Sequence, residues 1–361
     1  MVRYSIISLL IGLLIVGLLS GCGNKQVTET GLDEVAVSER QWTGVALSKD
    51  GRTFVCYPRW SNDVPISVAE ILQTGEIVAY PNEEWNQWDA ASSPTDRFVC
   101  VQSVFVDDQD FLWVLDPANP WFQGVIGQGP KLIKIDLTKN EVVQVVLFAE
   151  EITPPNCYLN DVRVDTKKGF AYITDSGLGA IIVVNLMSGE SRRVLADDPS
   201  TKSENIVLTI EGKQWLRPDG STPSVNCDGI ALDHDGKYLY YQALTGRSLY
   251  RIETRWLRDD TLSDEVRGEK VELVGKPGPA DGIMFGVDGN LYLSAIEENA
   301  IKRMKPDGRV EPVAKSPLLQ WPDSFSRAPD GYMYVTASQI NVDPSSRGSY
   351  RLFKFPVPGE H

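Results

Sequence analysis

The segment DGIALDHDGKYLYY, residues 228–241, decides the fold of this chain. An Asp-Gly pair opens a short apolar run, the polar turn DHDGK follows, and the segment ends in the aromatic-rich run YLYY. Asp and Gly supply the backbone angles of a tight turn, and aromatic residues fit a pleated, half-buried surface. The segment therefore predicts a β-hairpin.

The same pattern occurs six times along the chain. The other copies are TGVALSKDGRTFV at 43–55, VQSVFVDDQDFLWV at 101–114, NDVRVDTKKGFAYI at 160–173, DGIMFGVDGNLYL at 281–293 and DSFSRAPDGYMYV at 323–335. Their first apolar residues are 42 to 68 residues apart. A β unit repeated at roughly this period is typical of a propeller, in which each repeat forms one blade. We therefore predict an all-β, six-bladed β-propeller; the alternative is a set of hairpins scattered in a sandwich.

Each of the first five hairpins is followed by two more strand-like runs, which predicts blades of four strands. These runs lie at 68–72 and 76–80, 131–136 and 142–148, 181–185 and 191–195, 248–252 and 271–274, and 300–305 and 310–313. A further run at 34–38 precedes the first copy, and YRLFKF at 350–355 follows the last. A propeller must close its ring or leave strand edges unpaired. We therefore expect the N-terminal strand to join the last blade as its outer strand.

The N-terminus has the pattern of a targeting segment. Arg3 precedes an apolar stretch at 6–19, and LSGC at 19–22 resembles a bacterial lipobox. The resemblance implies a lipoprotein signal peptide at 1–21, a lipidated Cys22 with a tether at 22–32, and the propeller at 33–361. Acyl chains would anchor the protein, at about 0.8 kcal/mol for each buried methylene. We expect an exported, membrane-anchored lipoprotein of the bacterial cell envelope or an extracellular protein; the alternative is an uncleaved signal anchor.

Four further cysteines remain, at Cys56, Cys100, Cys157 and Cys227. Disulfides are allowed in an exported protein, but four cysteines permit three pairings and the sequence does not choose among them. Cys100, Cys157 and Cys227 each stand just before an inner strand, so a Cys157–Cys227 bond is one candidate. Buried free thiols are the alternative.

The charge of the chain restricts its partners. The net charge is −14 over 361 residues. Nucleic-acid binding needs a basic patch, so a nucleic-acid partner is not expected. An acidic surface also gives no electrostatic attraction to anionic membranes and serves solubility instead.

Polar side chains open the inner strand of every repeat, and we expect them to converge on one mouth of the central channel. They are Thr43, Gln102, Asn160, Asp228, Asp281 and Asp323, with Asp161 and Asn226 beside them. Such oxygen-bearing groups could hold Ca²⁺ or another divalent cation, for which Asn160, Asp228 and Asp281 are the candidate ligands, or the ammonium of an amine. Alternatively, each bonds backbone N–H groups of its own turn or of the neighbouring blade.

Histidine chemistry is not expected at this mouth. The chain has two histidines, His234 in a hairpin turn and His361 at the end, and we expect neither to reach the channel mouth. This argues against a Ser-His-Asp triad, a His-rich metal site and a His general base. Aromatic residues near the loops could line a pocket for a cationic ligand; the candidates are Trp121, Phe122 and Trp321.

Several phrases, in order along nearly the whole chain, resemble the major royal jelly protein/Yellow family in its bacterial, L-dopachrome tautomerase-related branch. They include GVALSKDGRTFVCYPRW at 44–60, LWVLDPANP at 112–120, YLNDVRVD at 158–165, AYITDSGLGAIIVVNL at 171–186 and LQWPDSF at 319–325. The resemblance implies an exported six-bladed propeller with a ligand pocket at one mouth. It does not imply one activity, since members include binders of small amines or sterols, pigment-pathway factors and food proteins.

A more distant resemblance connects the chain with gluconolactonase/regucalcin propellers, which bind a divalent metal through Glu, Asn, Asn and Asp. Asn160, Asp228 and Asp281 fall at comparable places, with Asp replacing one Asn, but Trp42-Thr43-Gly44 stands where the leading Glu is expected. Three functions therefore remain open. The first is the binding of a small amine, catechol or similar molecule at the mouth. The second is a metal-assisted lactonase or isomerase, and the third is a protein-interaction scaffold.

Overall fold

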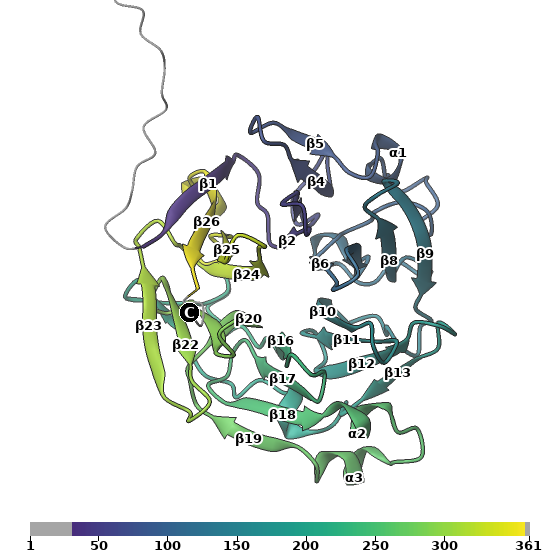
Figure 1. The fold of residues 1–361 in the computed structure, drawn as a ribbon, viewed down its shortest axis with the longest axis vertical. Helices are drawn as coiled ribbons and strands as arrows, with labels where there is room; N and C mark the ends of the chain where they lie inside the picture. The colour runs from purple at the N-terminus through teal and green to yellow at the C-terminus, as the bar shows by residue number, and fades with distance from the viewer. Residues whose placement is uncertain (1–30, 358–361) are drawn as a thin grey trace, which may run out of the picture.

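Each copy of the hairpin repeat forms the two innermost strands of one sheet in the computed structural model, which describes residues 31–357. These strands are β2 (Val45–Leu47) and β3 (Thr53–Cys56), β6 (Ser103–Val106) and β7 (Phe111–Asp116), β10 (Leu159–Asp165) and β11 (Phe170–Asp175), β16 (Cys227–Leu232) and β17 (Tyr238–Ala243), β20 (Ala280–Phe285) and β21 (Leu291–Ala295), and β24 (Pro322–Arg327) and β25 (Tyr332–Ala337). The six sheets surround one axis (Figure 1), so the predicted six-bladed propeller is confirmed.

Two outer strands complete each sheet, at positions close to those predicted. They are β4 (Val68–Ile71) and β5 (Ile77–Ala79), β8 (Lys131–Asp136) and β9 (Glu141–Leu147), β12 (Ala180–Asn185) and β13 (Ser191–Val194), β18 (Leu249–Glu253) and β19 (Glu272–Gly275), and β22 (Ala300–Met304) and β23 (Val310–Lys315). In blade six the third strand is β26 (Tyr350–Pro356).

The ring closes through the N-terminal strand β1 (Asp33–Ser38), as expected. It pairs antiparallel with β26, with Ser38 opposite Tyr350 and Val37 opposite Arg351. Figure 1 shows β1 beside β26 on the outside of the last blade. The first described strand of the chain thereby covers the edge of β26 that would otherwise be unpaired.

Apolar side chains fill the space between neighbouring blades. Trp113, Tyr172, Tyr241 and Tyr292 are fully or almost fully buried. Aromatic rings of this size contribute most of the apolar area that such contacts remove from water. The blades therefore pack through these rings together with many aliphatic side chains, while polar side chains remain along the channel.

The connections carry little regular structure. The helices are short: α1 (Glu83–Asn86), α2 (Thr254–Arg258), α3 (Asp264–Gly268) and the 3₁₀ turns η1 (Pro120–Phe122), η2 (Pro199–Thr201) and η3 (Pro344–Ser346). A two-stranded hairpin of β14 (Thr209–Ile210) and β15 (Lys213–Gln214), which we did not predict, lies in the long connection to blade four. Within residues 31–357 there is no helix of the length and hydrophobicity needed to span a bilayer.

Two sequence predictions about cysteine have different outcomes. The predicted lipobox and Cys22 lie outside the described residues. Cys56, Cys100, Cys157 and Cys227 are buried free thiols, so the candidate Cys157–Cys227 bond is not formed.

Removing β1 should destabilise the whole ring, because it leaves the edge of β26 unpaired and opens the last blade. We expect a chain that begins at residue 39 to melt several degrees lower than one that begins at residue 31, and to associate in solution. Differential scanning calorimetry and light scattering measure both effects. Equal melting temperatures for the two truncated chains would show that closure by β1 contributes nothing.

Candidate functional site at the acidic mouth of the channel

Four of the six inner strands begin with a β-bulge. The pairing register shifts at 159–162, 227–230, 280–283 and 322–325, in blades three to six. A bulge adds one unpaired residue and re-aims a side chain. Asn160, Asp228, Asp281 and Asp323 all lie within these bulges, which explains how four consecutive blades present a polar side chain at the same end of the channel.

Glycine makes this geometry possible at two of the bulges. A Cβ at Gly229 would clash with the backbone oxygen of Asp281, and a Cβ at Gly282 would clash with the backbone oxygen of Asp323. The inner strands of blades four, five and six therefore approach one another too closely for any side chain at these positions. This is a packing requirement, separate from the turn angles for which Asp-Gly pairs are known.

The predicted side chains meet around a cavity of about 810 Å³. Its lining includes Gln102, Asn160, Asp228, Asp281, Asp323 and Trp321, and we call this end of the channel the acidic mouth. Thr43 and Trp121 do not line the cavity. Thr43 is buried and donates its hydroxyl to the backbone oxygen of Gln102 at 2.8 Å. Of the three aromatic candidates, Phe122 and Trp321 line the cavity and Trp121 does not.

Hydrogen bonds link the polar side chains into a chain around the mouth. Gln102 Nε2 donates to Asn160 Oδ1 at 3.2 Å, and Asn160 Nδ2 donates to Asp228 Oδ2 at 2.8 Å. Trp321 Nε1 donates to Asp281 Oδ2 at 2.5 Å. Asp228 Oδ1 is buried and has no hydrogen-bond partner within the described part of the chain. The carboxyls of Asp228 and Asp281 can share a hydrogen bond when one of them is protonated; when both are ionised, this buried oxygen is unsatisfied, which is costly.

Burial raises the pKa of the three acidic groups at this mouth. It raises the pKa of Asp281 to about 7, while the indole of Trp321 opposes the shift. The pKa values of Asp228 and Asp323 lie well above the usual range, first because of burial and then because of the nearby carboxyl of Asp281. Like charges this close cannot all ionise, so the cluster retains protons near neutral pH.

Aromatic side chains form the walls above the acidic groups. On one side Phe122 lies between Trp60 and Tyr158, with ring centroids 5.3 and 5.1 Å apart. On the other side Trp215 meets Trp321 edge-on at 4.9 Å. The sequence did not single out Trp60, Tyr158 or Trp215. Tyr158 could have been noticed from its place two residues before Asn160, whereas the other two come from loops.

Hydrogen-bond donors already contact several oxygens of the cluster. Among the described residues there is no group of three or more His, Cys, Asp or Glu side chains arranged to hold a metal. Asn160 turns its amide nitrogen, a donor, toward Asp228, and Trp321 and Ser338 each donate to an acidic oxygen. A divalent cation needs several free oxygen lone pairs, and these bonds occupy some of them.

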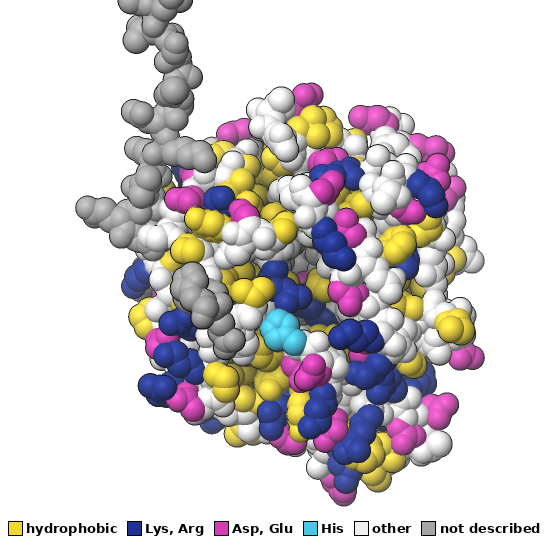
Figure 2. Space-filling view, in the orientation of Figure 1, with side chains coloured by type: hydrophobic (Ala, Val, Ile, Leu, Met, Phe, Trp, Pro, Cys, Tyr) yellow, Lys and Arg dark blue, Asp and Glu magenta, His cyan; other side chains and the backbone are white. Residues whose placement is uncertain are grey.

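His234 lies in the turn between β16 and β17, away from the acidic mouth. It lines a smaller cavity at the other end of the channel, where the inner strands end, together with Arg163 and Arg327. We call this end the basic mouth; Figure 2 shows a central hollow on this face, with basic side chains and the histidine at its rim. As expected, His234 does not line the acidic mouth; that it lines a cavity at the opposite mouth was not predicted.

A six-bladed propeller with a polar pocket at one mouth defines the class of this protein, and sequence comparison gives its family. The sequence model described as "Major royal jelly protein" matches residues 99–358, so the chain belongs to the major royal jelly protein family. Protein yellow of Drosophila madeirensis is 27% identical over 279 residues, which cover 69% of this chain and 46% of that protein. The chain thus spans about half the length of this curated relative.

Solved structures with a similar fold are more distant in sequence. A gluconolactonase from Xanthomonas campestris has a TM-score of 0.52 at 14% identity, over 91% of this chain and 90% of that one. A calcium-binding regucalcin from Agrobacterium tumefaciens has a TM-score of 0.52 at 14% identity, over 89% and 93% of the two chains. At this identity the likeness concerns the fold alone.

The raised pKa values predict a stability that falls as pH rises. Between the ordinary pKa of Asp and the raised folded values, the folded state binds more protons than the unfolded state, so its stability decreases with pH. We expect the melting temperature of the ligand-free protein to fall from about pH 6 to about pH 8.5. Asp228→Asn, which keeps the shape without the charge, should reduce the fall.

The exposed Asp260 supplies a matched control. Asp260→Asn should leave the pH dependence of the melting temperature as in the unmodified protein. A melting temperature that is flat or rising over this interval in the unmodified protein would contradict the raised pKa values.

Proposed function

We propose that the acidic mouth binds a small organic cation with an aromatic or apolar body, such as an aromatic amine. The observation that carries the proposal is Asp228 Oδ1, a buried acceptor without a partner among the described residues, next to two other acidic groups. An ammonium group placed there would donate the missing hydrogen bond. It would also replace protons that the cluster otherwise retains.

The walls of the cavity suit the rest of such a ligand. Trp60, Phe122 and Tyr158 offer ring faces and edges on one side, and Trp215 and Trp321 on the other. Aromatic faces attract cations and pack against flat apolar groups. The cavity of about 810 Å³ lies in the usual range for small-molecule sites.

Isothermal titration calorimetry with tyramine as the probe tests this proposal. We expect saturable binding that weakens by about tenfold or more in Asp228→Asn, which corresponds to about 1.4 kcal/mol. Asp260→Asn should bind as the unmodified protein does. Affinity should also rise from about pH 6 to about pH 8, with release of protons, because the ammonium favours ionised carboxylates.

Neutral catechol separates charge recognition from aromatic stacking. Binding of catechol as tight as that of tyramine, unaffected by Asp228→Asn, would contradict the role of the acidic groups. Failure of both probes, and of a wider set of aromatic amines, would remove the proposed function.

A second function, proton transfer in an isomerase, has one observation in its favour. Asp281 has a pKa of about 7 and lies beside Asp228, whose pKa burial also raises well above the usual range. A pair of carboxyls in different protonation states can serve as general acid and general base. Turnover of an aminochrome or a sugar lactone that disappears in Asp281→Asn, while tyramine binding persists, would favour the enzyme.

We also propose that the propeller is exported and held at a membrane by a lipid on Cys22. The support is the sequence LSGC at 19–22, which follows an apolar stretch. Metabolic labelling with a fatty acid in a bacterial host should mark the unmodified chain and leave Cys22→Ser unmarked. The matched control is Cys56→Ser, which changes a buried free thiol. Equal labelling of the unmodified chain and Cys22→Ser, or no labelling of either, would contradict the anchor.

A further inference from the structure

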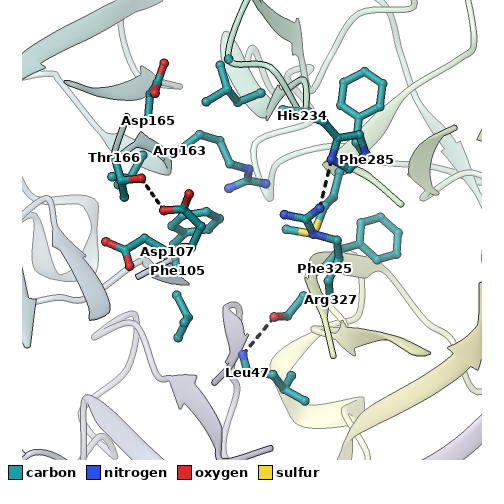
Figure 3. Close-up of a pocket in the computed structure, with 18 of the residues that line it drawn as sticks. Leu47, Phe105, Asp107, Arg163, Asp165, Thr166, His234, Phe285, Phe325 and Arg327 are labelled. Carbon is teal, nitrogen blue, oxygen red and sulfur yellow. Dashed lines mark hydrogen bonds between the residues drawn. The ribbon is translucent and has the colours of Figure 1, made fainter. Parts of the chain in front are cut away.

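The basic mouth is a separate cavity at the far end of the channel from the acidic groups, with a volume of about 290 Å³. Apolar side chains from several blades form its walls, among them Leu47, Phe105, Phe285 and Phe325. Arg163 in β10 and Arg327 in β24 extend into the cavity (Figure 3). These strands belong to blades three and six, which face each other across a six-bladed ring, so two positive charges converge on the axis from opposite sides.

Arg163 is buried with part of its donor capacity unused. Its side chain donates through Nη1 to the oxygen of Val162 at 2.7 Å and through Nη2 to the oxygen of Ile283 at 3.0 Å. Nε is buried and has no partner among the described residues. The residue is only 7% exposed, and the carboxylate of Asp161 lies 3.8 Å from Nη2. A buried guanidinium with an unpartnered N–H is costly unless a further acceptor reaches it.

The two arginines also repel each other. Burial lowers the pKa of Arg163; Asp161 raises it, and the charge of Arg327 lowers it again. Two cations held together in a partly dry cavity favour an anion between them.

His234 positions Arg327 within this cavity. The imidazole Nε2 lies 2.9 Å from the backbone oxygen of Gly286, which can only accept, so Nε2 carries the proton. Nδ1 is then the acceptor for Arg327 Nη1 at 3.4 Å. Arg327 is exposed at the mouth and has no carboxylate within the 4.0 Å of an ion pair among residues 31–357, but the charge of Asp108 in the same cavity acts on it from further away. The histidine thus orients the guanidinium without neutralising it.

Five acidic residues also line this cavity, and four of them accept hydrogen bonds from their own turn or from the next blade's turn: Asp107, Asp108, Asp165 and Asp233; the fifth is Asp235. Asp107 accepts hydrogen bonds from two backbone N–H groups of its turn and from Trp113 Nε1 at 2.8 Å. Asp165 pairs with Lys168 at 3.1 Å, and Asp108 accepts from a threonine hydroxyl. These bonds direct the carboxylate oxygens toward the turns, and the two guanidinium groups keep donors free for a ligand.

We propose that the basic mouth is a second ligand site, which binds a phosphate group, free or carried by a small molecule, between Arg163 and Arg327. Guanidinium groups bind phosphate through short, charge-assisted hydrogen bonds, and donors from opposite sides suit a tetrahedral oxyanion better than a planar carboxylate. The apolar walls offer space for a small substituent. Because the protein as a whole carries a charge of −14, its overall field does not attract anions, and binding depends on this local arrangement.

Calorimetric titration with inorganic phosphate and with phenyl phosphate, each at constant ionic strength set with sodium chloride, tests the proposal. We expect saturable binding of at least one probe. Arg327→Gln, a change at an exposed position that should fold normally, is expected to weaken it by about tenfold or more. Arg309→Gln removes the same charge from an exposed turn and serves as the matched control. Stronger binding of phenyl phosphate would indicate a phosphate ester as the natural ligand, and stronger binding of inorganic phosphate would indicate the free ion.

A nuclear magnetic resonance measurement gives an independent readout. The Nε–H signal of Arg163, assigned by its loss in Arg163→Lys, should shift on addition of phosphate in the unmodified protein and not in Arg327→Gln. Absence of saturable binding for both probes would overturn the proposal, and so would equal affinity of Arg327→Gln and the unmodified protein. Tyramine binding at the acidic mouth is measured separately, so failure at one mouth is distinguishable from failure at the other.

Discussion

The close approach of inner strands around the axis is the constraint on which the rest of the structure depends. At Gly229 and Gly282 the next blade's backbone leaves no space for a Cβ. Hydroxyl groups also connect neighbouring blades: Thr174 Oγ1 donates to the oxygen of Asp228 at 2.7 Å, and Thr336 Oγ1 donates to the oxygen of Thr43 at 2.5 Å. The second contact joins blade six to blade one. Packing at the axis and pairing of β1 with β26 therefore close the same ring from the inside and the outside.

This packing also determines the chemistry of the channel. The bulges that bring the strands together place Asp228 and Asp281 where water is largely excluded, so their pKa values rise. At the other end, Arg163 and Arg327 converge because their strands lie on opposite blades. Asp161 is buried beside Arg163. Its charge also raises the pKa values of Asp228 and Asp281, so it connects the charged groups of the two mouths. One channel thus carries a cluster of carboxyls with raised pKa values at one mouth and two arginines at the other, of which Arg163 is paired with Asp161 at 3.8 Å.

The fold could be predicted from the sequence because every copy of the repeat forms the same structural unit. Each hairpin supplies two inner strands, and strand-like runs at both ends of the chain required closure. The convergence of Asn160, Asp228 and Asp281 followed from their equivalent places in the repeat. The walls could not be predicted in the same way, because Trp60 and Trp215 come from loops whose course depends on contacts with other blades. The second cavity, which His234 lines at the opposite mouth, was not predicted for the same reason, since the direction of a turn relative to the axis is a tertiary property.

At the acidic mouth, protons and a cationic ligand compete for the same carboxyl groups. Three buried carboxyl groups cannot remain charged together, so the ligand-free site retains protons, and any ligand that binds there must compete with them. A metal ion would need oxygen lone pairs that Trp321 and Ser338 already occupy on Asp281 and Asp323. An ammonium group, by contrast, brings its own hydrogen-bond donors to Asp228 Oδ1 and can pack its apolar part against the aromatic walls. The proposed binding of an organic cation therefore rests on the same arrangement that makes the site costly when empty.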